Sequence, residues 1–123
     1  MNSAESTVHT YFDAFNRSDV ESIVRLFTEE GTVMADGTPT ATGHDQIRST
    51  YKGAFESICV HFVCVIEKVV EEGKMAIVRA HATGSITMLS TNSTNSAPQH
   101  RELFVLRQSD AGWKITDYIF NII

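Results

Sequence analysis

The order of the hydrophobic patterns limits the folds that this chain can adopt more than any other feature. Apolar residues recur at helical spacing in three early stretches, which predict helices near residues 3–16, 19–29 and 43–57. From residue 59 the pattern changes to long β-branched and aromatic runs, which predict antiparallel strands as far as residue 122. Helices that each bury one face, followed by a sheet, predict an α+β domain with three N-terminal helices packed on a mainly antiparallel sheet.

The segment between the second and third predicted helices reads as a short hairpin. Asp36-Gly37 is a strong signal for a tight turn, so residues 32–42 are expected to pair with each other. Pro39 cannot donate to a strand ladder, which predicts a short edge strand after the turn. Further on, residues 90–99 carry no apolar side chain larger than Ala or Pro, and we expect an exposed loop there.

Length and charge exclude several classes of function. With 123 residues the chain is expected to form one domain, residues 1–123. Its 10 Lys and Arg against 15 Asp and Glu give a net charge of −5, with no basic cluster of the kind that binds nucleic acid. No stretch is apolar enough for a membrane helix, and no signal peptide is visible. We therefore expect a cytoplasmic protein with no nucleic-acid or membrane partner.

The sequence contains no motif for a metal or an organic cofactor. Cys59 and His61 would share one face of a strand, but no further ligands follow at usable spacing. There is no glycine-rich phosphate loop and no nucleophile elbow. We therefore expect no metal and no cofactor.

Three segments carry a resemblance to a known family. Residues 10–37, 42–51 and 101–121 resemble the SnoaL-like proteins of the nuclear-transport-factor-2-like superfamily, which also includes ketosteroid isomerase. The last segment is most similar to the SgcJ/EcaC-like subgroup. The resemblance covers essentially the whole chain. It implies a strongly curved sheet that forms a cone with an internal pocket, and a homodimer that forms through the outer sheet face.

Ketosteroid isomerase provides a residue-by-residue comparison. Its chemistry needs a tyrosine hydroxyl and a protonated carboxyl group around the developing oxyanion, together with a carboxylate base. The resemblance places Tyr11 at the tyrosine position, and Ala35, with Asp36 one residue later, at the base position. Phe104 takes the position of the protonated acid. Because a phenyl ring cannot donate that hydrogen bond, we predict negligible ketosteroid isomerase activity.

A polar cluster is predicted where two strands face the cone. In the run 74–89, Arg79 and His81 alternate with small apolar residues, and Glu102, with His100 on the same face of the next strand, could pair with them. If the small residues meet a second subunit, the Arg79 face looks into the cone; the opposite facing is equally compatible with the pattern. The first alternative predicts that Arg79, His81 and Glu102, with Tyr11 and Asp36, form a catalytic or ligand-orienting site. A structural salt bridge is the alternative interpretation.

The function that follows is binding of a small hydrophobic or mixed-polarity molecule in an apolar cone pocket. Such a protein could be a cofactor-independent isomerase, cyclase or hydrolase; the alternative is a non-catalytic dimerisation domain with a filled cone. The pocket walls are expected to be aromatic, comprising Phe15, Tyr51, Phe55, Phe104, Tyr118 and Phe120. The dimer face is expected to combine small and apolar strand residues, namely Ala76, Val78, Ala80, Ala82, Val60, Phe62, Leu103 and Val105.

Overall fold

The computed structural model, which describes residues 2–123, places three helices among seven strands. Its first half consists of α1 (Ala4–Asn16), α2 (Val20–Arg25), β1 (Phe27–Met34), β2 (Ala41–Thr42) and α3 (His44–Ser57). Its second half consists of β3 (Ile58–Glu72), β4 (Met75–Met88), β5 (Ser93–Ser96), β6 (His100–Ser109) and β7 (Gly112–Ile122).

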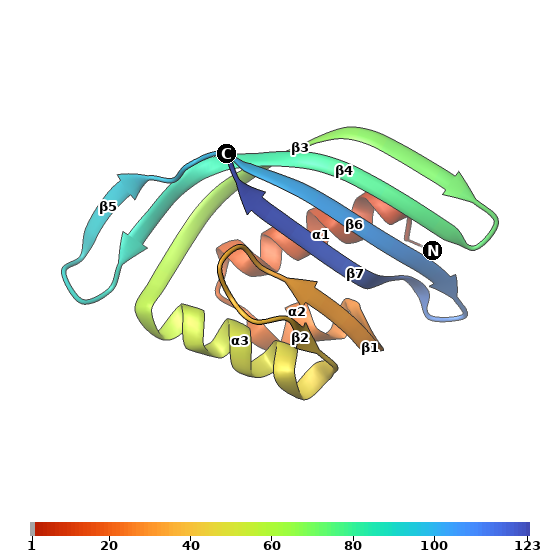
Figure 1. The fold of residues 1–123 in the computed structure, drawn as a ribbon, viewed down its shortest axis with the longest axis horizontal. Helices are drawn as coiled ribbons and strands as arrows, with labels where there is room; N and C mark the ends of the chain where they lie inside the picture. The colour runs from red at the N-terminus through yellow and green to blue at the C-terminus, as the bar shows by residue number, and fades with distance from the viewer. Residues whose placement is uncertain (1) are drawn as a thin grey trace.

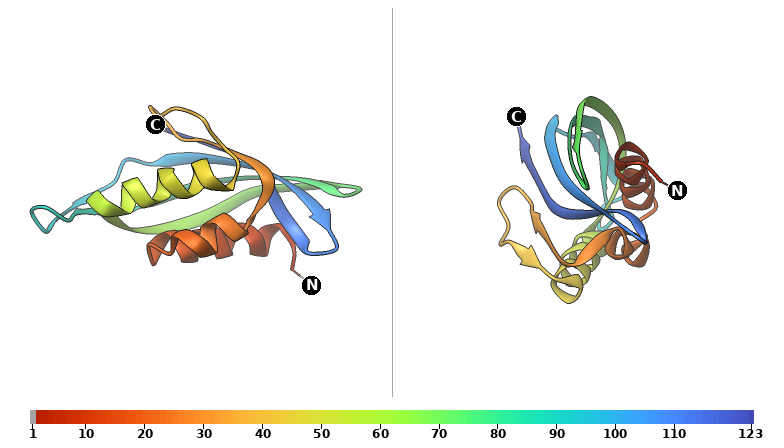
Figure 2. Two further views of the ribbon diagram at one scale, coloured as in Figure 1. Left: turned by 90° about the horizontal axis from the view of Figure 1, so that it is seen from below. Right: turned by 90° about the vertical axis from the view of Figure 1, so that its right-hand side faces the viewer.

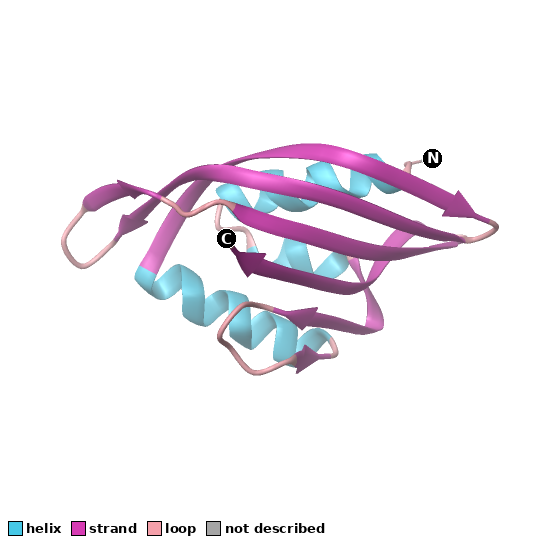
Figure 3. Cartoon of the chain, turned by 45° about the horizontal axis from the view of Figure 1, so that its top comes forward, coloured by secondary structure: helices cyan, strands magenta, loops and turns pink. Residues whose placement is uncertain are grey.

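All seven strands belong to one open, strongly curved sheet. Its order is β2-β1-β7-β6-β4-β3, and β5 pairs with the far end of β4. Every pairing is antiparallel except that of β1 with β7. The long strands arch over the helices, which lie on the concave side (Figures 1 and 3). Two perpendicular views show the β1–β2 hairpin and α3 along one border of this shell (Figure 2). The predicted α+β architecture is confirmed.

Helix α1 begins and packs as its sequence predicts. Ser3 accepts a hydrogen bond from the Ser6 amide while the Ser6 hydroxyl accepts one from Ser3, which satisfies two amides at the helix start. Val8, Tyr11 and Phe12 form the buried face, and none is more than 4% exposed. This face lies against β3, β4 and β7.

The predicted helix 19–29 is wrong at its C-terminal end. Helix α2 stops at Arg25, and β1 begins at Phe27. The amide of Ile115 donates to the carbonyl of Leu26 at 2.8 Å, and Phe27 pairs with Ile115 in the parallel β1–β7 ladder. In the sequence, Phe27 continues the helical spacing of Val20, Ile23 and Val24. In the fold it is buried as a strand residue, because pairing with a distant strand overrides the local pattern.

The hairpin prediction is confirmed, whereas the predicted loop 90–99 is wrong in part. Thr32 pairs with Thr42 and Val33 with Ala41 around the turn, where Gly37 has a φ of 76° that favours glycine. Within residues 90–99, however, the strand β5 pairs with Ser85–Met88 of β4. All four β5 residues are exposed, so this strand forms by backbone pairing alone, and no hydrophobic pattern in the sequence predicts it.

The small apolar residues of β4 face the helices and not a second subunit. Ala76, Val78, Ala80 and Ala82 are at most 2% exposed, and all but Ala80 belong to the cluster of aromatic and aliphatic core residues. Small side chains at these positions leave room for bulky rings from α1 and β6 on the same side of the sheet. Val60 and Phe62 of β3 are buried as well. Of the predicted dimer face, only Leu103 and Val105 lie on the outer side of the sheet, so that residue assignment is wrong.

Candidate functional site

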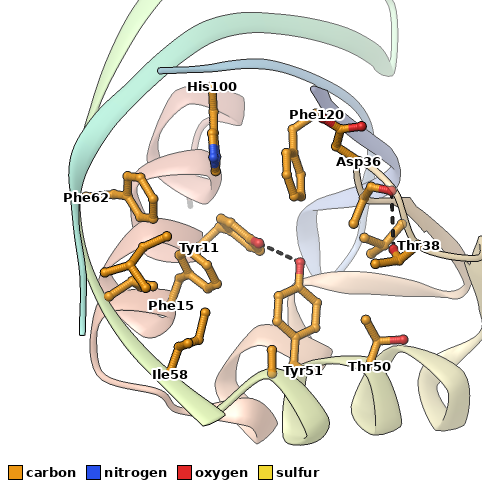
Figure 4. A pocket seen from close by; sticks show the side chains of 15 residues that line it. Tyr11, Phe15, Asp36, Thr38, Thr50, Tyr51, Ile58, Phe62, His100 and Phe120 are labelled. Carbon is orange, nitrogen blue, oxygen red and sulfur yellow. Dashed lines mark hydrogen bonds between the residues drawn. The ribbon is translucent and has the colours of Figure 1, made fainter. Parts of the chain in front are cut away.

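A cavity of about 340 Å³ lies between the concave face of the sheet, α1 and α3. Figure 4 shows its labelled side chains converging on a common space. The walls are mostly apolar, with a few hydroxyl groups, one imidazole and one carboxylate at the edges. The lining residues are Tyr11, Phe15, Val33, Ala35, Asp36, Thr38, Thr50, Tyr51, Ala54, Ile58, Val60, Phe62, Ile86, His100 and Phe120. This combination is typical of a small-molecule site.

A chain of hydrogen bonds runs from the cavity wall into the core. The hydroxyls of Tyr51 and Tyr11, which both point into the cavity, are 2.5 Å apart (Figure 4). Tyr11 is also hydrogen-bonded to Tyr118, and the Tyr118 hydroxyl donates to Oε2 of Glu102 at 2.5 Å. The four side chains come from α3, α1, β7 and β6, so only the folded chain assembles them.

Burial determines the acid–base properties of the four side chains in this hydrogen-bond chain. Glu102 is 2% exposed, and removal from water raises the pKa of its carboxyl group to about 7, although the bond from Tyr118 partly opposes the rise. Burial also raises the pKa values of Tyr11, Tyr51 and Tyr118 above their ordinary value of 10, which keeps the three phenols protonated. Among these four side chains, the carboxyl group of Glu102 is therefore the one that changes charge near neutral pH.

His100 enters the cavity from the start of β6. Its ring stacks on Phe120, with centroids 5.0 Å apart, and lies 5.1 Å from the ring of Phe62. Its Nδ1 is 3.8 Å from Oε1 of Glu102. Burial lowers the pKa of His100, while Asp36 acts in the opposite direction. Because the imidazole loses its proton more easily and the carboxyl group keeps its proton longer, this contact is not an ion pair at neutral pH.

Asp36 lies at the rim of the cavity in the β1–β2 turn. Its Oδ2 accepts a hydrogen bond of 3.0 Å from the amide of Ile122, which ties the turn to the end of β7. The carboxylate is therefore held at the mouth of the pocket, where it can accept a proton from a bound molecule.

The predicted Arg79–His81–Glu102 cluster is wrong. Arg79 lies on the outer side of the sheet, and His81 contacts Glu67 there, with Nδ1 and Oε2 3.6 Å apart. Glu102 pairs with Ala80 across the β4–β6 ladder and therefore shares its inner face. Alternation along β4 established that Arg79 and Ala80 face opposite sides, but burying the small residues under the helices decided which side is inside.

The structure brings together most of the other predicted site residues. Tyr11, Phe15, Asp36, Tyr51 and Phe120 line the cavity. Tyr118 and Phe104 lie deeper, stacked with centroids 4.2 Å apart, and Phe55 packs on Phe15 and Tyr51 outside the lining.

Two features of the site are absent from the sequence predictions. His100 is predicted only as a partner for Arg79, although its spacing of two residues from Glu102 places both on one face. The Tyr51–Tyr11–Tyr118 chain has no signal in the sequence, since those positions carry no common motif.

Comparison with known proteins agrees with this geometry. The family profile of the SnoaL-like domain matches residues 8–118. The chain belongs to the SnoaL-like family. A solved structure described as a ketosteroid isomerase-like protein from Erwinia carotovora atroseptica is similar, with 31% identity and a TM-score of 0.91 over 97% of this chain and 92% of that one.

A more distant structure shows the same fold. It is described as an NTF2-like protein with a cystatin-like fold, from Novosphingobium aromaticivorans, and has 18% identity and a TM-score of 0.77 over 96% of this chain and 78% of that one. No functionally curated protein matches the sequence. None of the helices within residues 2–123 has the length and hydrophobicity needed to cross a membrane.

Proposed function

We propose that this SnoaL-like protein binds a small, mainly apolar molecule that carries one hydrogen-bonding oxygen. The observation that carries the proposal is the apolar cavity of about 340 Å³ with the hydroxyls of Tyr11 and Tyr51 at its wall. Apolar walls provide affinity, and a few polar groups fix the orientation of the ligand. An open cavity also favours this proposal over a dimerisation domain with a filled cone.

The pocket also has the groups that a cofactor-independent proton transfer requires. A carbonyl oxygen held by a tyrosine hydroxyl would be polarised, and the carbon next to it would lose a proton to His100 or Asp36. The electron pair would then move onto the oxygen, where the hydroxyl stabilises the developing charge. Support comes from the similarity to a protein described as ketosteroid isomerase-like. An isomerase, cyclase or hydrolase acting on a small hydrophobic substrate is consistent with these groups.

Direct binding to the cavity tests this proposal. α-Naphthol and α-tetralone, two bicyclic probes with an oxygen at the same position, are titrated calorimetrically against the wild-type protein and two tryptophan variants. Ala54→Trp places a large ring in the cavity, whereas Lys52→Trp places the same ring on the exposed side of α3. We expect Ala54→Trp to lose binding and Lys52→Trp to retain it. Equal binding by both variants, or no binding to the wild type, contradicts the proposal.

We also propose that two copies of the chain associate through the outer sheet face. Three exposed apolar residues there support the proposal: Ile77, Leu103 and Ile119 are 46%, 38% and 43% exposed. They lie on the adjacent strands β4, β6 and β7: Leu103 is opposite Ile119, and Ile77 is opposite Val105, two residues along β6 from Leu103. Light scattering is expected to give twice the chain mass of 13.6 kDa, and Leu103→Glu is expected to shift it toward a single chain. A wild-type mass of one chain at micromolar concentration contradicts association.

A further inference from the structure

The direction of the tyrosine hydrogen bonds depends on the group at the buried end of the chain. Each tyrosine hydroxyl carries one proton, so it can donate one hydrogen bond while it accepts another. The chain of hydrogen bonds runs from Tyr51 through Tyr11 and Tyr118 to Glu102. As long as each hydroxyl donates to one neighbour and accepts from the other, reversing one bond reverses the others as well.

An ionised Glu102 turns every proton inward. A carboxylate only accepts hydrogen bonds, so Tyr118 must donate to it. The Tyr118 oxygen then accepts from Tyr11, and the Tyr11 oxygen accepts from Tyr51. With its proton committed to Tyr11, Tyr51 offers only lone pairs to the cavity. The pocket then favours a ligand that donates a hydrogen bond.

A protonated Glu102 allows the opposite arrangement. Its O–H group can donate to Tyr118, which releases the Tyr118 proton toward Tyr11 and the Tyr11 proton toward Tyr51. The hydroxyl of Tyr51 is then able to donate into the cavity. In this state the pocket favours a ligand that accepts a hydrogen bond, such as a carbonyl group.

We infer that Glu102, three hydrogen bonds behind the cavity wall, selects the ligand group that the pocket anchors: a phenol or enol hydroxyl when it is ionised and a ketone oxygen when it is protonated. The inference rests on the proposed small-molecule function. It makes Glu102 a positioning residue, because its side chain does not line the cavity wall and acts through the tyrosines. Its pKa of about 7 means that both states occur within a narrow range around neutral pH.

Several other titratable groups surround Glu102 and must be separated from its effect. His100 lies on the same strand, Cys64 faces it from β3, and Asp36 lies beyond His100 at the rim. Burial raises the pKa of the Cys64 thiol to about 12, so this group stays neutral. On β4 the residue opposite Glu102 is Ala80, which has no charge. His100 and Asp36 are therefore the groups whose ionisation a test has to distinguish.

Matched probes and variants provide that distinction. The dissociation constants of α-naphthol and α-tetralone are measured at about pH 5.5 and about pH 8.5, below the range in which a phenol ionises. In the wild type, the preference for naphthol over tetralone is expected to rise about tenfold with pH, the order expected for one buried hydrogen bond gained or lost. Glu102→Gln and Tyr118→Phe should both abolish this change, because one removes the ionisable group and the other interrupts the chain.

Two variants separate the ionisation of Glu102 from that of His100 and Asp36. Tyr118→Phe leaves His100 and Asp36 in place, so a pH-dependent preference that survives in this variant overturns the inference. Glu67→Gln, the same substitution on the outer sheet face, should behave as wild type. A wild type that binds both probes with a constant preference also overturns the inference but leaves the proposed function intact. If neither probe binds at either pH, both proposals fail.

Discussion

Replacing Glu102 by Gln should change how the stability of the protein depends on pH. Gln has nearly the same shape, and its carbonyl oxygen can still accept the hydrogen bond from Tyr118. The variant differs from wild type chiefly in that it cannot ionise. The comparison therefore isolates the free-energy cost of placing a negative charge at this buried position.

The magnitude follows from the pKa of Glu102 in the folded and unfolded chain. That pKa is about 7 in the fold and 4.5 in the unfolded chain, so the folded state holds the proton more tightly. The contribution is fully present below pH 4.5 and is lost as the pH rises toward 7. Across this window the wild type should lose about 3 kcal/mol of unfolding free energy relative to Glu102→Gln. This is a large share of the 5–15 kcal/mol typical of a domain.

Urea unfolding followed by circular dichroism, at pH values from about 4 to about 8, measures this difference between the two proteins. Because all other groups titrate in both proteins, the difference reports mainly on Glu102. Glu67→Gln serves as the matched control, since Glu67 is half-exposed and its substitution should leave the pH profile unchanged. Parallel profiles for wild type and Glu102→Gln would show that burial in the fold does not raise the pKa of Glu102. A wild type that gains stability with rising pH would instead show that Glu102 is paired with a positive charge in the fold.

Three further predictions concern two glycines, the Asn2 side chain and isomerase activity. Gly84→Ala should cost about 3 kcal/mol in urea unfolding, because its Cβ would overlap the carbonyl oxygen of His61. Gly53→Ala, with open space around it, should instead stabilise α3 by up to about 1 kcal/mol, and equal effects of the two substitutions would contradict this prediction. Asn2→Ala should cost about 1 kcal/mol by the same assay, because the Asn2 side chain accepts from the Trp113 amide at 2.8 Å and donates to Thr7 at 2.8 Å; an unchanged midpoint would show that this tie adds nothing. The wild-type chain should show negligible ketosteroid isomerase activity with a steroid enone, because Phe104 stacks on Tyr118 and offers no donor; turnover comparable to an isomerase would disprove this.

Much of the fold could be predicted because it depends on local patterns. The stripe of Val8, Tyr11 and Phe12 defines one face of α1 wherever that helix packs, and Asp36-Gly37 specifies its turn from two residues. Predictions failed where distant segments decide the outcome. Phe27 completes a helical stripe but pairs with Ile115 in a strand, and no property of the α2 segment indicates that partner.

In the candidate site as well, local patterns predicted some features and distant segments decided the others. Residue types and alternation determined, from the sequence alone, that Arg79 and His81 oppose the small residues of β4 and that Glu102 shares a face with His100. A period of two is symmetric, however, so it cannot say which face is inside. Tertiary structure decided this when the helices covered the small residues, which buried Glu102 and left Arg79 outside. It also joined Tyr51, Tyr11 and Tyr118 to that carboxyl group, since hydrogen bonds between four separate elements exist only once packing brings them within reach.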